Sequence, residues 1–246
     1  MNFPSRCLAL RLALLATVAG AQGLWVEAKV LTPLRVELPT SMVPGHTYPL
    51  VLLLHGRGGS AKAMLSLRSR LGTESFILAA PQGPYAMGEG FCWFLPTQDP
   101  TLWAHTDAQA VELIQRAIQS LKQRHPVGHV YLLGHSEGAA LAYLTAVKLR
   151  AELAGLLVFG AGKPSALLED ADLAALKGLP HFLAHGQSDR TSPYGELPAR
   201  VAFWQAAGVP TTFVGYAGGH GLNDAPIEAA AAWILKQEQT RAPAAP

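Results

Sequence analysis

Short apolar runs and longer amphipathic stretches alternate along the chain from residue 50 onward. Apolar and β-branched runs bounded by polar, Gly or Pro residues predict β-strands. These runs lie at 50–54, 75–80, 130–133, 156–159, 180–184 and 211–215. Between these predicted strands, four apolar residues recur as a stripe at the spacing of one helix face and predict a helix. Three further stretches also predict helices. The stripe is Val111, Ile114, Ile118 and Leu121, and the stretches are 139–144, 200–207 and 227–237. This alternation predicts an α/β fold with a mostly parallel central sheet and helices on both faces.

The pattern of residues also predicts the edge of the sheet and the lengths of the connections between strands and helices. Residues 25–38 predict two extended segments around Thr32 and Pro33, forming an edge hairpin. A capping-box pattern from Thr106 to Gln109 predicts that the helix with the apolar stripe begins near Asp107. The connection 81–105 is then long, and it is rich in aromatic residues that could line a pocket or pack the loop onto the sheet. The connection 160–179 has room for one short helix around 166–176, so we expect no large lid.

A strand-turn-helix motif stands near the middle of the chain. Residues 134–138 read Gly-His-Ser-Glu-Gly, which fits the pattern G-x-S-x-G. The predicted strand 130–133 precedes this turn and the predicted helix 139–144 follows it. Such a nucleophile elbow holds a serine hydroxyl above the edge of a sheet, where a substrate can reach it. The flanking glycines are needed because larger side chains would collide with the neighbouring backbone. Ser136 is therefore the candidate nucleophile.

A nucleophilic serine needs a base, and the base needs a carboxylate to orient it. On this type of fold the three residues follow in the order Ser, acid, His. Among the 9 histidines of the chain, only His220 lies beyond Asp189. Each of these two residues follows a predicted strand, so both are expected at the edge of the sheet where a site assembles. Asp224 comes after His220, and chain order therefore favours Asp189. The alternative is three loop residues with unrelated roles.

A glycine-rich loop follows the first buried strand. Residues 55–60 read His-Gly-Arg-Gly-Gly-Ser, a composition that lets the backbone approach a substrate carbonyl closely. We expect the amide of Arg57 to pair with the amide of Glu137, directly after the candidate nucleophile, as an oxyanion hole. The loop fits neither G-x-G-x-x-G nor a Gly-Lys-Ser/Thr ending, which argues against a phosphate site. An ordinary tight turn is the alternative.

With these motifs the chain resembles the α/β-hydrolase superfamily. Within it, the chain is most similar to small serine esterases of the phospholipase/carboxylesterase, dienelactone-hydrolase and polyester-depolymerase types. The resemblance rests on residues 54–59, 81–84, 93–94, 134–138, 186–189 and 219–220. It implies that Trp93 and Phe94 help to wall the substrate pocket. One position departs from the family, which often has Gln or Met after the serine where this chain has Glu137. An acidic side chain there disfavours anionic substrates.

The N-terminus has the features of a secretory signal. Arg6 and Arg11 give a basic start, an apolar run extends from 12 to 19, and Ala19-Gly20-Ala21 fits small-x-small cleavage. The apolar run is too short to span a bilayer, which takes roughly 20 residues. We therefore expect a signal peptide at 1–21, an α/β-hydrolase domain at 22–240 and a disordered tail at 241–246. The expected location is secreted or periplasmic, with no stable membrane insertion.

The charge balance and the cysteine content limit the classes of partner and ligand that we expect. Removing residues 1–21 takes away two arginines and no acid, so the mature formal charge is 17 − 17 = 0. This balance argues against a nucleic-acid partner, which would require a basic face. Cys92 is then the one cysteine left, and we interpret it as a small buried hydrophobe. The histidines are scattered, so we expect no metal site, and the chemistry implied by the motifs needs no cofactor.

The expected function is hydrolysis of a small-molecule or polymer-end carboxylic ester through an acyl-enzyme on Ser136, His220 and Asp189. A thioesterase or a small peptidase could use the same triad. A non-catalytic binding protein on a hydrolase scaffold is a further alternative, although an intact triad argues against it.

Overall fold

The computed structural model describes residues 30–72, 74–161, 172 and 174–241. The predicted signal peptide at 1–21 lies outside these residues, and so does the predicted tail at 241–246 apart from Arg241. So do the first half of the predicted edge hairpin and most of the short helix expected around 166–176. From Leu31 onward the chain forms one compact unit.

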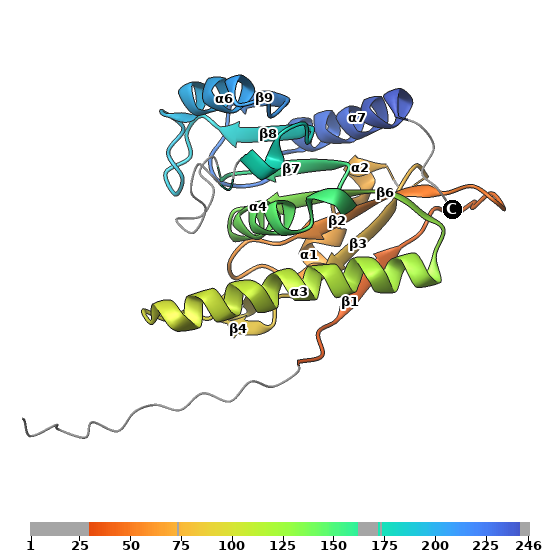
Figure 1. Cartoon of the computed structure of the whole chain (residues 1–246), viewed down its shortest axis with the longest axis horizontal. Coiled ribbons are helices and arrows are strands. Elements are labelled where there is room, and N and C mark those ends of the chain that lie inside the picture. Colours follow the sequence, from red (N-terminus) through yellow and green to blue (C-terminus); the bar gives the residue numbers. More distant parts are fainter. Residues whose placement is uncertain (1–29, 73, 162–171, 173, 242–246) are drawn as a thin grey trace, which may run out of the picture. The chain divides into compact units, whose positions relative to one another are not determined.

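The centre of this unit is a seven-stranded sheet in the order β1-β3-β2-β6-β7-β8-β9 (Figure 1). All neighbouring strands run parallel except the edge strand β1, which pairs antiparallel with β3. Its members are β1 (Leu34–Glu37), β2 (Tyr48–Leu54), β3 (Ile77–Pro81), β6 (Val127–His135), β7 (Gly155–Phe159), β8 (His181–Gly186) and β9 (Thr211–Tyr216). A separate small hairpin joins β4 (Tyr85–Met87) to β5 (Gly90–Cys92). The predicted sheet is thus confirmed, with one antiparallel edge.

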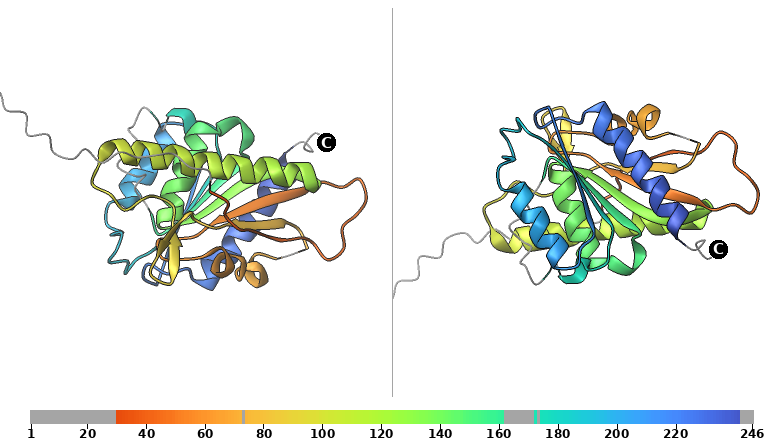
Figure 2. Two further views of the ribbon diagram at one scale, coloured as in Figure 1. Left: turned by 90° about the horizontal axis from the view of Figure 1, so that it is seen from below. Right: turned by 90° about the horizontal axis from the view of Figure 1, so that it is seen from above.

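Helices cover both faces of the sheet (Figure 2). One face packs against α3 (Pro100–Arg124), α4 (Glu137–Lys148) and α6 (Leu197–Ala206). The other face packs against α1 (Ala61–Leu65), α2 (Arg68–Leu71) and α7 (Asp224–Thr240). The 3-10 helices η1 (Arg150–Glu152) and η2 (Ala174–Leu176) complete the helical elements of the described residues. Each predicted helix in this part of the chain is present.

Strand β2 shows why the sheet is the core. Leu50, Leu52 and Leu54 belong to the cluster under α3 and α4, whereas Val51 and Leu53 belong to the cluster under α7. None of these five side chains is exposed to solvent. Side chains alternate across a strand, so a strand buried on both faces must be apolar throughout. Full burial of each is worth about 1.5–3 kcal/mol.

Helix α3 begins earlier than the sequence pattern predicts. Asp99 is its N-cap, with the side chain accepting a hydrogen bond from the Thr101 amide at 2.8 Å, and Pro100 occupies the first turn. Thr106 lies inside the helix, where its hydroxyl donates to the Trp103 carbonyl. The predicted start near Asp107 is therefore wrong, because Asp99 and Pro100 form the stronger start signal seven residues upstream. The connection from β3 to α3 is correspondingly shorter and holds the β4–β5 hairpin.

Candidate active site

Ser136 sits at the turn between β6 and α4. Its φ of 53° and ψ of −115° make it the one non-glycine residue with positive φ in the described part of the chain. A backbone of this kind costs about 1–3 kcal/mol and is held by its surroundings. Gly134 and Gly138 make the turn possible. A Cβ on Gly138 would lie 2.3 Å from the Leu54 carbonyl oxygen, and one on Gly134 would lie 2.3 Å from the Gly138 carbonyl oxygen.

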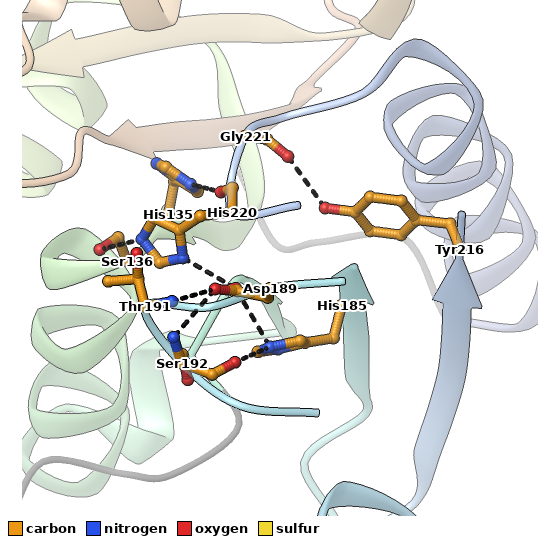
Figure 3. A network of polar contacts seen from close by, with 9 residues as sticks. All are labelled: His135, Ser136, His185, Asp189, Thr191, Ser192, Tyr216, His220 and Gly221. Carbon is orange, nitrogen blue, oxygen red and sulfur yellow. Dashed lines mark hydrogen bonds and ion pairs between the residues drawn. The ribbon is translucent and has the colours of Figure 1, made fainter. Parts of the chain in front are cut away.

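Three side chains from three loops meet at this turn (Figure 3). His220 Nε2 lies 2.8 Å from Ser136 Oγ, and His220 Nδ1 lies 2.8 Å from Asp189 Oδ2. Asp189 follows β8 and His220 follows β9, so the parallel strands bring both to the same edge as Ser136. An ionised carboxylate only accepts hydrogen bonds, so Nδ1 of His220 carries the proton. Nε2 then accepts from the Ser136 hydroxyl, the arrangement that a general base requires.

Asp189 is held in its charged form. Its Oδ1 accepts hydrogen bonds from the amides of Thr191 and Ser192, at 2.8 and 2.9 Å, and its side chain is buried. Desolvation alone would raise the pKa of this carboxyl. The hydrogen bonds from the Ser192 amide, from His220 and from the Thr191 amide outweigh desolvation, and the pKa of Asp189 is lowered. A permanent negative charge therefore faces the imidazole.

Two further histidines support the site, and the sequence pattern did not identify either. The fully buried His185 places Nε2 2.7 Å from the Ser192 carbonyl oxygen and 3.2 Å from Asp189 Oδ2. His135 places Nε2 2.7 Å from the carbonyl oxygen of His220, which ties the loop after β9 to the elbow. Burial lowers the pKa of His135, so the ring is neutral and donates this bond. The sequence places His135 beside the elbow, but it contains no signal for where that side chain points.

One predicted oxyanion donor, the Glu137 amide, belongs to the elbow, and the other, the Arg57 amide, belongs to the glycine-rich loop after β2. Glu137 is the first residue of α4, so its amide has no intrahelical acceptor. The Arg57 amide makes no backbone hydrogen bond within the described residues, unlike the amides of Gly58 and Gly59. Both residues line the same cavity as Ser136. Two unpaired N–H groups in such a place are suited to a developing negative charge.

The side chain of Glu137 has a structural task that its position in the motif does not indicate. Oε1 accepts from Arg57 Nε at 3.0 Å, and Oε2 accepts from the Trp93 amide at 2.9 Å. The carboxylate is 7% exposed, so the ion pair is shielded on one side. It joins the elbow to the glycine-rich loop and to the chain after β5. The negative charge expected to repel anionic substrates is thus paired with a guanidinium.

The two predicted pocket aromatics differ in position. Phe94 lines the cavity, but Trp93 is fully buried and does not. The Trp93 indole N–H donates to the His55 carbonyl at 2.7 Å, and the ring stacks on His55 with centroids 4.6 Å apart. The expectation that Trp93 walls the pocket is therefore wrong, since its ring is fixed against the end of β2. Trp103, from α3, contributes an aromatic wall instead.

The cavity above Ser136 has a volume of about 1260 Å³. Its walls come from the loop after β2, from α1, from the segment 94–98, from α3 and from the loops around Thr191 and His220. It includes Ser136, His220, Arg57 and Glu137, so a substrate could reach the hydroxyl and the candidate donors together. Within the described ranges, no group of three or more His, Cys, Asp or Glu is arranged to hold a metal ion. No helix there is long and apolar enough to cross a membrane.

A family model described as Phospholipase/Carboxylesterase matches residues 44–237, a range that contains the glycine-rich loop, the elbow, Asp189 and His220. The chain belongs to the phospholipase/carboxylesterase family. It is an ester hydrolase of the carboxylesterase kind, and its fold is the α/β-hydrolase fold. Membership of this family implies ester substrates. No curated protein is similar enough in sequence to count as a match.

Solved structures share the fold of this phospholipase/carboxylesterase family member. The esterase PE8 superposes with a TM-score of 0.68 at 22% identity, covering 84% of this chain and 99% of its own. The Bacillus cereus carboxylesterase gives 0.68 at 19% identity, covering 84% and 95%. The carboxylesterase from Mesorhizobium loti gives 0.67 at 20% identity, covering 83% and 94%. At these identities the likeness concerns the fold alone.

Proposed function

We propose that the enzyme cleaves carboxylic esters through a covalent acyl-enzyme on Ser136, with His220 as general base and Asp189 as its orienting acid. One observation carries this proposal. An unbroken chain of hydrogen bonds runs from Asp189 through His220 to Ser136, and Ser136 and His220 both line the large cavity. The positive φ of Ser136, a backbone conformation that costs energy, supports the same assignment.

The proposed mechanism gives each of these residues one role. His220 Nε2 takes the proton from the Ser136 hydroxyl as Oγ attacks the carbonyl carbon, while Asp189 stabilises the imidazolium. The amides of Arg57 and Glu137 donate to the resulting oxyanion. The tetrahedral intermediate collapses, His220 gives its proton to the leaving alcohol oxygen, and the acyl group remains on Ser136. Water then enters, loses a proton to His220 and releases the acid by the reverse sequence.

The chemical class of the bond is testable with matched substrates. We expect hydrolysis of 4-nitrophenyl butyrate and none above background for the corresponding 4-nitroanilide, because an amide carbonyl is less electrophilic than an ester carbonyl and an amine leaves less readily than a phenol. Release of the chromophore measures both. Phenyl butyrate and S-phenyl thiobutyrate form a second pair. Comparable cleavage of the anilide would favour a peptidase, and a clear preference for the thioester would favour a thioesterase.

We also propose that the enzyme acts outside the cytoplasm, in the periplasm or the medium, on a soluble small ester or a polymer end. The support is the basic start, the short apolar run and the small residues before Gln22. Mass spectrometry of enzyme released by its native host should show Gln22 as the N-terminal residue. Enzyme retained in the cytoplasm with Met1 or Asn2 intact would contradict the proposed export.

A further inference from the structure

The wall of the cavity formed by α3 carries a carboxylate that the hydrolytic mechanism does not use. Trp103 and Asp107 are four residues apart on α3, and both line the cavity that holds Ser136. Residues at this spacing are neighbours on one helix face. Phe94 lines the same cavity. An aromatic surface and a carboxylate therefore stand together within the substrate space.

Asp107 has no partner for its charge. Its side chain makes no hydrogen bond and no ion pair with any described residue, although it is partly buried. Desolvation raises the pKa of the Asp107 carboxyl to about 6. The group is still mainly ionised at pH 7.5, so the folded protein holds an uncompensated, partly desolvated negative charge there. A polar group in this state is costly unless something binds it.

The other charged groups of the cavity do not compensate Asp107. Arg57 is the cationic residue among the lining residues, and its Nε lies 3.0 Å from Glu137 Oε1. Burial lowers the pKa of His55 and of His135, so both rings are neutral at pH 7.5. Among the described lining residues, Arg57 and Glu137 thus form one ion pair, and the Asp107 carboxylate is unpaired. Its electrostatic complement is a cation.

The aromatic ring of Trp103 is also suited to bind a cation. Its indole N–H donates to the Thr97 carbonyl at 2.6 Å, which holds the ring at the cavity wall. The ring is 37% exposed, so a ligand can contact it. Ammonium groups bind aromatic rings through the ring quadrupole, and more strongly where water is partly excluded. A carboxylate beside an aromatic ring is a suitable binding site for an ammonium ion.

We propose that the enzyme prefers esters that carry an ammonium group, with Asp107 as counter-ion and Trp103 as the aromatic contact. This inference rests on the proposed hydrolysis at Ser136 and specifies its substrate class. The cation could belong to the alcohol or to the acyl part, since the cavity extends from Ser136 to α3. The two placements require separate substrates.

The test compares each cationic ester with a neutral ester of the same shape. Acetylcholine and 3,3-dimethylbutyl acetate place the difference in the alcohol. Ethyl 4-(trimethylammonio)butanoate and ethyl 5,5-dimethylhexanoate place it in the acyl group. We expect kcat/KM to favour the cationic member of one pair about tenfold, the size of one partly desolvated contact of a quaternary ammonium with an aromatic ring and a carboxylate. A ratio near one in both pairs would overturn the proposal.

Substitution identifies the residue responsible. Asp107→Asn should abolish the preference and leave kcat/KM for the neutral ester within about twofold of wild type. Glu112→Gln is the matched control, because Glu112 lies on α3 as well but is exposed and paired with Arg116 at 2.6 Å. It should keep the preference. A preference retained in Asp107→Asn would overturn the role of Asp107. If the neutral ester is still hydrolysed, the Ser136 mechanism is intact and only the role of Asp107 has failed. A failure of the Ser136 mechanism would affect both esters.

Discussion

Replacing Ser136 by alanine is expected to lower kcat for 4-nitrophenyl butyrate by about 10⁶. The substitution removes the atom that attacks the carbonyl, and it leaves His220 Nε2 without the hydroxyl proton that it accepts. Folding should be preserved, because alanine adds no volume at a position that already has its unusual backbone. Initial rates, with the melting temperature measured alongside, check the expectation.

Ser120→Ala is the matched control for this substitution. Ser120 lies on α3, where its side chain contacts Arg124. It is absent from the cavity lining, so wild-type turnover is expected. A Ser136→Ala enzyme with more than a tenth of wild-type kcat would contradict the assignment of the nucleophile.

Replacing Asp189 by asparagine is expected to lower kcat by about 10⁴. All the polar groups around this carboxylate are donors or rings that can donate: the amides of Thr191 and Ser192 meet Oδ1, and His220 and His185 meet Oδ2. The side-chain amide of asparagine would direct its own N–H bonds either at the two backbone amides or at the two histidine rings. If it donates to His220 Nδ1, the proton moves to Nε2, and the ring can no longer accept from Ser136.

Asp224→Asn is the control for the choice of acid. Asp224 is exposed and pairs with Arg70 at 3.0 Å, and within the described part of the chain it makes no hydrogen bond or ion pair with His220. We expect its substitution to leave kcat unchanged. A large loss in Asp224→Asn together with a small loss in Asp189→Asn would show that the wrong carboxylate has been assigned.

The elements that the sequence predicts well are those fixed by local chemistry. A short apolar run such as 50–54, followed by a glycine-rich loop, favours a doubly buried strand. Glycine is required at 138, where the backbone passes close to Leu54, and at 134, where it passes close to Gly138. Ser136, Asp189 and His220 follow β6, β8 and β9, three parallel strands of one sheet. Their meeting at one edge follows from that topology.

The features that the sequence does not predict depend on tertiary contacts. Trp93 and Phe94 are adjacent and similar in chemistry, and only packing decides that the first stacks on His55 while the second faces the cavity. The Glu137 side chain accepts hydrogen bonds from Arg57 and from the Trp93 amide, two residues that lie in other segments of the chain. Opposite charges at the two predicted oxyanion positions were the one available hint. The start of α3 was missed because two competing cap signals lie within one stretch.

Covalent labelling by a fluorophosphonate, followed by peptide mapping, tests the central claim most directly. Such a reagent reacts with a serine only when that serine is activated as a nucleophile, so labelling reports the complete arrangement of Ser136, His220 and Asp189. The account predicts one adduct per chain, on the peptide that contains Ser136, and its loss in both Ser136→Ala and Asp189→Asn. An adduct on another serine, or none on active folded enzyme, would contradict it.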